Sequence, residues 1–314
     1  MIPKDRAIAA LELREPDDIV PTTELQFQLA DELVGRDYYR GDIFQQSTGA
    51  ERDRMINHNV ELMLEICERL DYSITPSVGW LPDEEHSLPL LKRLGGDRYL
   101  IAAINGGTYG IPSGQNMEEF SCWLHDDPEA AKAKATQMAH DCIERGKRQA
   151  EWGVDVIALC TDYCFNDGPF LSPRMFREFV TPYLYQIVTA LKALGVYVVI
   201  HTDGNIMPIL DDLLLGGPHA LHSLDPMAGV DIAEVQCLVG DRVALIGNVN
   251  CALLQIGSED DLRESARYCL KHCVPGGGYI YCSSNVAFKG MILDRLFIMM
   301  EERERWGRYP APKP

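Results

Sequence analysis

Short apolar runs alternate with longer segments of helical periodicity along the whole chain. The short runs are rich in Val, Ile, Tyr and Leu and have the length of buried β-strands, whereas the longer segments repeat apolar residues every three to four positions. The pattern predicts strands at 19–23, 72–76, 99–104, 154–159, 196–200, 220–224, 243–246 and 279–282. It predicts helices at 54–70, 128–152, 173–194, 206–215, 232–239, 259–273 and 293–306.

The predicted helix 173–194 carries signals at both ends and a break inside. Ser172 precedes Pro173 as cap and first helical residue, and Gly195 follows the last helical position. Pro182 lies within the helix and lacks the N–H that the helical ladder needs. We therefore expect this helix to be kinked or divided near Pro182.

Strands that alternate with helices in a chain of 314 residues favour a (β/α)₈ TIM barrel, that is, a single α/β domain over 1–314. A doubly wound open sheet is the alternative, because both folds show the same alternation. The residues before the first strand form an N-terminal extension. Segment 107–127 has no clear periodicity and is rich in glycine, so we expect a long loop over the barrel mouth.

The run 196–200 is the strongest pointer to chemistry. It is wholly apolar, as expected of a buried parallel strand, and it ends abruptly in His201, with Asp203 and Gly204 directly after it. Polar residues after a parallel strand lie at its carboxyl end, where α/β folds place their chemistry. His201 and Asp203 are therefore the first candidate functional residues.

Other predicted strands also end in polar residues. Asp162 and Tyr163 could act as an acid–base pair or orient a substrate, although Tyr163 could equally be a wall of the pocket. Nitrogen, oxygen and sulfur ligands for zinc are available at the ends of the later strands, from His201, Asp203, Asp225 and Cys282. The alternative to a metal site is that His201 is only hydrogen-bonded and Cys282 is only a buried thiol. Polar residues after strands can also serve simply as helix caps. The candidate substrate-binding residues are Gln26, Asn105, Tyr109, Asp225, Asn248 and Asn285.

Composition excludes several classes of protein. A net charge of −18 argues against nucleic acid and against anionic membrane surfaces. The N-terminus has no apolar core of signal-peptide length, and the ten cysteines are scattered, so we expect a cytoplasmic protein with reduced thiols. The dinucleotide, phosphate-loop and nucleophile-elbow motifs are absent from the sequence, which disfavours nucleotide-dependent and serine-hydrolase chemistry.

Several segments spread over most of the chain resemble the uroporphyrinogen decarboxylase superfamily in order and spacing. They are Asp5-Arg-Ala-Ile-Ala-Ala10, Glu15-Pro-Asp-Asp-Ile-Val-Pro21, Gly168-Pro-Phe-Leu-Ser-Pro173, Phe179-Val-Thr-Pro-Tyr183, His201-Thr-Asp-Gly-Asn205, Asp225-Pro-Met-Ala-Gly-Val-Asp231, Leu245-Ile-Gly-Asn-Val249 and Trp306-Gly-Arg-Tyr309. The resemblance implies a (β/α)₈ barrel with its site at the carboxyl ends of the strands.

The true decarboxylases of this superfamily carry an Arg-Gln-Ala-Gly-Arg signature that holds the acidic groups of a porphyrinogen. This chain has Glu24-Leu-Gln-Phe-Gln-Leu-Ala30 in that region, without an arginine pair. Ser283-Ser-Asn-Val286 stands where the decarboxylases have Gly-His-Gly. The resemblance therefore favours the other branch, which is similar to cobamide-dependent methyltransferases.

Thiol-using members of that branch hold zinc through His-x-Cys and a later Cys. Here the first motif reads His201-Thr-Asp203, and Asn285 is the nearest equivalent of the later cysteine, with Cys282 three residues earlier. The resemblance implies a metal site at His201, Asp203 and Cys282 with fewer thiolates. Such a metal is more electrophilic, which suits a neutral ether or amine.

The expected function is transfer of a methyl group between a small methylated substrate (methoxy or methylamine type) and a corrinoid protein, as in O-demethylation. The chain has no Asp-x-His-x-x-Gly segment, so the cobamide would arrive on that partner. Zinc is the expected metal, and monomers and homodimers are both compatible with the sequence. One alternative is a metal-free decarboxylase acting on a small acid or porphyrinogen, with Asp162 or Asp203 as proton donor. A binding protein on the same barrel is the other.

Overall fold

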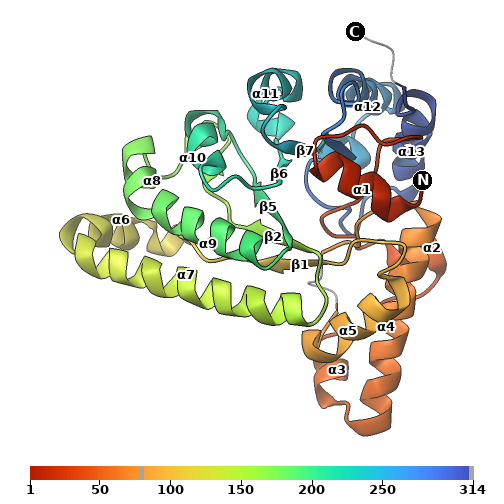
Figure 1. Cartoon of the computed structure of the whole chain (residues 1–314), viewed down its shortest axis with the longest axis horizontal. Helices are drawn as coiled ribbons and strands as arrows, with labels where there is room; N and C mark the ends of the chain where they lie inside the picture. Colours follow the sequence, from red (N-terminus) through yellow and green to blue (C-terminus); the bar gives the residue numbers. More distant parts are fainter. Residues whose placement is uncertain (78–80, 311–314) are drawn as a thin grey trace.

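A computed structural model of the chain describes residues 1–77 and 81–310. Its main sheet contains six parallel strands, each joined to the next through helical segments (Figure 1). In spatial order they are β1 (Ala102–Asn105), β2 (Val156–Cys160), β5 (Tyr197–Thr202), β6 (Ala220–Ser223), β7 (Ala244–Val249) and β8 (Tyr279–Ser283). A short antiparallel pair, β3 (Cys164–Phe165) and β4 (Gly168–Pro169), follows β2.

Segments 19–23 and 72–76 complete the ring between β8 and β1. The closing hydrogen bonds run from Tyr281 N to Pro21 O (2.9 Å), from Ser73 N to Thr22 O (2.8 Å) and from Thr75 N to Leu100 O (2.9 Å). Both segments pair through isolated bridges and contain a proline, Pro21 or Pro76, which cannot donate to the ladder. All eight predicted strands thus occupy the ring to within a few residues. The TIM barrel is confirmed and the open sheet is not formed.

Helices surround this ring, and α7 and α9 lie side by side, with α7 against β1 and α9 against β5, while α3, α4 and α5 project from one side (Figure 1). The helices are α1 (Pro3–Leu11), α2 (Ala30–Val34), α3 (Asp42–Gln46), α4 (Gly49–Arg69), α5 (Glu84–Gly95), α6 (Met117–Asp126), α7 (Pro128–Glu151), α8 (Pro173–Phe179), α9 (Thr181–Ala193), α10 (Leu210–Leu214), α11 (Ile232–Val239), α12 (Glu259–Cys273) and α13 (Leu293–Trp306). Short 3₁₀ turns cover Gly114–Asn116, Met207–Ile209, Pro226–Ala228 and Cys251–Leu254.

The predicted break near Pro182 is confirmed. The helical segment divides at Val180 into α8 and α9, and Pro182 lies in the first turn of α9, where a missing N–H costs nothing. Ser172 caps α8 by accepting a hydrogen bond from Met175 N at 3.4 Å. Local end signals were therefore sufficient to place both helix boundaries.

Segment 107–127 is not the uninterrupted loop that the sequence predicts, because it contains α6. This helix buries only Leu124 fully, although Met117, Phe120 and Leu124 recur at helical spacing in its sequence. Phe120 and Trp123 of α6 pack on the Tyr109 ring with centroid distances of 5.2 and 6.0 Å. The helical pattern is therefore present at 117–124, but the glycine-rich stretch before it favours a loop.

Two hydrophobic layers pack on the strands. Small and branched side chains such as Ala158, Val199 and Ile246 fill the barrel interior, whereas a larger cluster lies between the strands and the helices. α1 contributes Ala7 and Ala10 to the interior cluster, so the N-terminal extension packs against the barrel. All ten cysteines are free. Within the described ranges, none of the helices combines the length and the apolar character that a membrane crossing requires.

Candidate functional site

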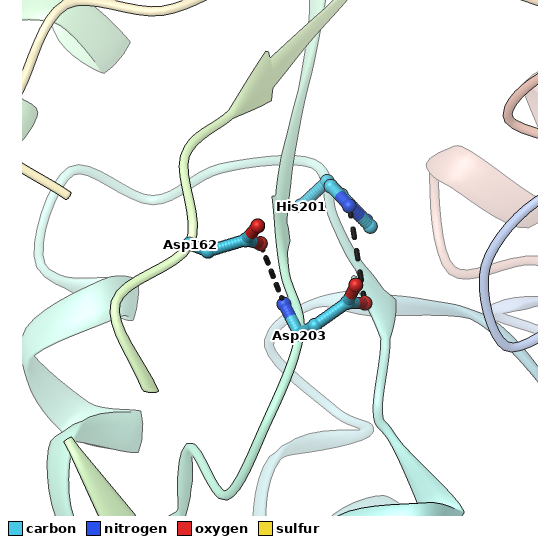
Figure 2. A group of neighbouring side chains, drawn as sticks. All are labelled: Asp162, His201 and Asp203. Carbon is cyan, nitrogen blue, oxygen red and sulfur yellow. Dashed lines mark hydrogen bonds and ion pairs between the residues drawn. The ribbon is translucent and has the colours of Figure 1, made fainter. Parts of the chain in front are cut away.

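Three potential metal ligands converge at the carboxyl ends of β2 and β5. Asp162 follows β2, His201 is the penultimate residue of β5, and Asp203 follows β5. One ligand atom from each lies within 4.8 Å of the others (Figure 2). His201 and Asp203 are two positions apart at the end of a strand, and residues with that spacing project to the same face. Strand geometry therefore brings together a candidate metal pair and a candidate catalytic residue.

Hydrogen bonds hold the Asp203 carboxylate from the end of β6 and from the segment that follows β8. Its Oδ1 accepts from Ser223 Oγ at 2.6 Å, and its Oδ2 accepts from Asn285 Nδ2 at 2.6 Å. The Asp203 backbone N–H donates to Asp162 Oδ1 at 3.1 Å. Burial raises the pKa of Asp203, and the nearby carboxylates act in the same direction. Asp203 is thus a positioned carboxyl group with a raised pKa.

The His201 imidazole lies behind these carboxylates. Its Nε2 is 3.9 Å from Asp203 Oδ1, and its Nδ1 is 2.7 Å from Nδ1 of His222. Burial lowers the pKa of both His201 and His222, because removing a charged ring from water is costly. Both rings are therefore neutral near pH 7, which is the state in which imidazole binds a metal.

The glycine-rich segment after β1 contacts the Asp162 backbone. Ile111 N donates to Asp162 O at 2.8 Å, and a Cβ on Gly110 would lie only 2.9 Å from the same oxygen. A side chain at position 110 would push the segment away. The glycine therefore permits the close approach that places this segment beside the cluster.

Two other predicted residues lie near the cluster, Asp225 after β6 and Asn285 after β8. Asn285 contacts Asp203 directly, as described above. Asp225 Oδ2 accepts from Gly204 N at 3.4 Å, and its Oδ1 accepts from Met227 N at 2.9 Å, so Asp225 caps the turn that follows β6. The capping alternative considered for polar strand ends therefore applies to Asp225.

The predicted substrate residues Asn105, Tyr109 and Asn248 hydrogen-bond elsewhere. Asn105 Nδ2 donates to Cys142 O on α7 at 3.0 Å, and Tyr109 OH donates to Ala131 O on α7 at 2.9 Å. Asn248 Oδ1 accepts from the Cys269 thiol on α12 at 3.3 Å, and its Nδ2 donates to Leu224 O directly after β6. These bonds tie Asn105 and Tyr109 to α7, and they tie Asn248 both to α12 and to the end of β6, rather than to the three-ligand cluster.

Tyr163 and Gln26 also have defined partners. Tyr163 is buried, its hydroxyl is 2.5 Å from the Thr108 hydroxyl, and its ring packs edge-on against Phe176 at 5.1 Å. Burial raises the pKa of Tyr163 to about 12. Gln26 is half-buried, and its Oε1 accepts from Gln28 Nε2 at 3.4 Å. Tyr163 therefore belongs to the packed layer between barrel and helices.

Cys282 lies outside the three-ligand group. Its fully buried Sγ is 3.6 Å from His222 Nε2 and donates to Ser283 O at 3.1 Å. Burial raises the pKa of this thiol well above its ordinary value, so it stays protonated. The structure thus separates Cys282 from His201 by the width of the His222 ring.

Sequence reasoning did not assign roles to His222, Ser223 or Glu24. His222 is the register partner of His201 in the β5–β6 pair, and Ser223 follows it. The signal was present in the sequence, because both strands end in a histidine followed by a hydroxyl residue. Glu24 is buried and accepts hydrogen bonds from Ser283 N (2.9 Å) and Ser283 Oγ (2.6 Å). Burial raises the pKa of Glu24 to about 7.

Comparison with known proteins places this geometry in a family context. Residues 100–306 match the family described as uroporphyrinogen decarboxylase (URO-D). The uroporphyrinogen decarboxylase of Thioalkalivibrio sulfidiphilus is 27% identical over 206 residues, which cover 64% of this chain and 56% of that protein. The methylcobamide:CoM methyltransferase MtaA of Methanosarcina barkeri is 24% identical over 181 residues, covering 57% of this chain and 51% of that protein. The chain spans about half the length of the curated relatives it matches.

One solved structure matches along nearly the whole chain. A methyltransferase from Methanosarcina mazei superposes with a TM-score of 0.74 at 18% sequence identity, and the match covers 97% of this chain and 99% of that one. Identity at this level speaks for the fold alone. It agrees with the closed barrel described above.

Proposed function

Because this chain belongs to the uroporphyrinogen decarboxylase family, we propose that its barrel mouth houses a metal-assisted methyl transfer. The methyl group moves between a small methylated substrate (methoxy or methylamine type) and the cobalt of a corrinoid protein. The observation that carries the proposal is the convergence of Asp162, His201 and Asp203 at the carboxyl ends of β2 and β5. This is the place where barrel enzymes gather their catalytic groups.

The donor set fits zinc. Catalytic zinc sites combine three nitrogen or oxygen ligands from the protein with one open position, and this cluster supplies one neutral imidazole and two carboxylates. Two carboxylates balance the charge of a divalent ion. Bound zinc would polarise an ether oxygen or amine nitrogen as a Lewis acid.

The residues around the cluster orient its ligands. Ser223 and Asn285 each donate to one oxygen of Asp203, so neither oxygen is free to rotate away. The Asp203 N–H donates to Asp162 and ties the two carboxylates together. Such preorganisation reduces the cost of assembling a site when a ligand arrives.

The surroundings favour a neutral substrate. Phe165 on the β3–β4 hairpin, three residues after Asp162, is 42% exposed and packs edge-on against Phe170 at 6.1 Å. Asn205 N donates to Phe165 O at 2.9 Å, so the hairpin backbone lies beside the segment that follows β5, and the exposed ring there offers apolar surface to a methylated molecule. The net charge of −18, without the arginine pair of the true decarboxylases, disfavours a polyanionic porphyrinogen. Substrate charge therefore separates this proposal from porphyrinogen decarboxylation.

The relatives support the corrinoid partner. The Methanosarcina barkeri relative is a methylcobamide:CoM methyltransferase, and the Methanosarcina mazei structure is that of a methyltransferase. This chain has no cobalamin-binding motif of its own, so we infer that a separate corrinoid protein presents the cobalt at the barrel mouth. The cobamide supplies the methyl-carrying chemistry, and this chain supplies substrate binding and orientation.

A second candidate, a metal-free decarboxylase acting on a small acid, draws on one observation. Burial raises the pKa of Asp203, and a carboxyl group that retains its proton can act as an acid. Several relatives also carry the name uroporphyrinogen decarboxylase. Metal content separates the two candidates, because only the first requires an ion at His201.

Elemental analysis of the untagged protein tests the proposal. We expect about one zinc per chain in the wild type, and loss of that zinc in His201→Ala. His140→Ala is the matched control, because His140 lies on α7 with a 65% exposed side chain and should keep the zinc. Absence of zinc from the wild type, even after zinc is supplied, would overturn the mechanism and move the decarboxylase to first place. If the wild type holds zinc, methylation of added cob(I)alamin by methoxylated or methylamine substrates is measured next on the zinc-loaded protein.

A further inference from the structure

A second imidazole stands directly behind the proposed metal ligand. His222 is 2% exposed, and its Nδ1 lies 2.7 Å from Nδ1 of His201. The β5–β6 register places the two residues side by side on neighbouring strands. The other nitrogen of His222, Nε2, lies 3.6 Å from Cys282 Sγ inside the barrel. Both nitrogens of His222 therefore have partners within the protein.

The contacts of Cys282 and His222 select where each hydrogen sits. A thiol has one hydrogen, and Cys282 donates it to Ser283 O at 3.1 Å. His222 Nε2 must then be the donor to the Cys282 sulfur. A neutral imidazole has one N–H, so His222 Nδ1 is left as an acceptor and His201 Nδ1 must donate to it. His201 Nε2 consequently carries a lone pair.

The opposite placement of the imidazole hydrogens leaves one buried N–H without a hydrogen-bond partner. If His222 Nδ1 donated to His201, then His201 Nε2 would carry the hydrogen. That nitrogen is 3.9 Å from Asp203 Oδ1, which is too long for a hydrogen bond. A buried N–H without a partner costs about 1–3 kcal/mol, so the first arrangement is favoured.

We propose that His222 is a positioning residue that holds His201 with its Nε2 unprotonated and directed at Asp162 and Asp203, ready to bind a cation. This inference rests on the metal site proposed above and adds a residue to it. A metal-bound histidine needs a partner on its other nitrogen to set the tautomer and the ring orientation. Carboxylates and backbone carbonyls usually fill that role, and here a second imidazole fills it.

Two substitutions of His222 separate hydrogen bonding from packing. His222→Asn keeps an amide oxygen near the position of Nδ1 and can accept from His201, whereas His222→Leu fills a similar volume without an acceptor. Zinc affinity is measured by competition with a chromogenic chelator, and circular dichroism with thermal unfolding reports on the fold. We expect His222→Leu to bind zinc about 10–100-fold more weakly than the wild type, and His222→Asn to stay within a few-fold of it. Equal affinity in wild type and His222→Leu would overturn the inference.

A second measurement decides the question without metal. Nitrogen NMR of the ¹⁵N-histidine-labelled apo protein reports which ring nitrogen carries hydrogen. The inference expects hydrogen on Nδ1 of His201 and on Nε2 of His222 in the wild type, and loss of the fixed His201 tautomer in His222→Leu. Hydrogen on Nε2 of His201 in the wild type would overturn it. If the wild type bound no zinc, the proposed function would fail on its own, and the NMR result would still support or overturn the role of His222.

Discussion

Asn285 donates a hydrogen bond of 2.6 Å to Asp203 Oδ2, although 82 positions separate the two residues in the sequence. The family resemblance places Asp203 where thiol-using methyltransferases have the cysteine of His-x-Cys, and Asn285 nearest to their later cysteine. The barrel brings the ends of β5 and β8 together so that the two side chains touch. A carboxylate and an amide thus lie in hydrogen-bond contact at the two positions where the resemblance places two thiolates.

Cysteines introduced at positions 203 and 285 should turn the cluster into a metal site with thiolate ligands. We expect the double variant Asp203→Cys, Asn285→Cys to bind cobalt(II) through thiolates, because both side chains already face one another. Absorption spectra of the cobalt-loaded protein measure this, since thiolate ligation adds intense charge-transfer bands that the wild type lacks. The single variant Asn285→Cys is the control and should show weaker bands. Identical spectra in wild type and double variant would contradict the assignment.

Asp162→Asn should remove metal without damaging the fold. The amide oxygen can still accept from Asp203 N, so the free energy of unfolding should change by about 0.5 kcal/mol or less. Zinc affinity should fall by more than about 10-fold, because one of the charged ligands is lost. Urea unfolding and chelator competition measure the two effects. Asp167→Asn, an exposed change in the adjacent turn, should leave both unchanged.

Cys282→Ser should keep the zinc. The thiol of Cys282 is buried beside His222 and is not part of the three-ligand group, and a serine hydroxyl can both accept from His222 and donate to Ser283 O. We expect one zinc per chain and a loss of about 1–2 kcal/mol in the free energy of unfolding, since a polar atom replaces sulfur in the core. Loss of zinc from a folded Cys282→Ser protein would make Cys282 a ligand after all.

Glu24 should make stability depend on pH. Burial raises its pKa from 4.5 to about 7, so the folded state holds the proton more tightly than the unfolded state. Its contribution is fully present below pH 4.5 and is lost as the pH rises through 7. Glu24→Gln mimics the protonated form and should gain up to about 3 kcal/mol over the wild type above pH 7, with little difference at pH 4.5. Urea unfolding of both proteins across pH 4.5–8.5 measures this difference.

The control for that prediction is another buried glutamate. Glu302 is also fully buried, but Arg263 and Arg267 donate to it at 2.7 Å, and these hydrogen bonds and charges outweigh burial and lower its pKa. Glu302→Gln should therefore destabilise the protein at pH 8 rather than stabilise it. Stabilisation by both changes would point to a general effect of removing negative charge.

Local sequence pattern was sufficient for the strand–helix alternation, the break near Pro182 and the placing of His201 and Asp203 at a strand end. These features depend on neighbours within a few positions, such as a short apolar run, a cap or a proline. The bounds of α12 and α13 match the predicted helices. The helix α6 was missed because the glycine-rich stretch before it predicts a loop.

Only the folded barrel determines where a side chain points and which group it hydrogen-bonds to. Asn105 and Asn248 lie near the carboxyl ends of β1 and β7, as polar site residues would, yet Asn105 bonds to α7, and Asn248 bonds to α12 and to Leu224 O. The His201–His222 contact depends on the register between two strands, which lie 21 positions apart. A sequence lists the donors and acceptors of a chain, but their pairing follows from distances that only packing sets.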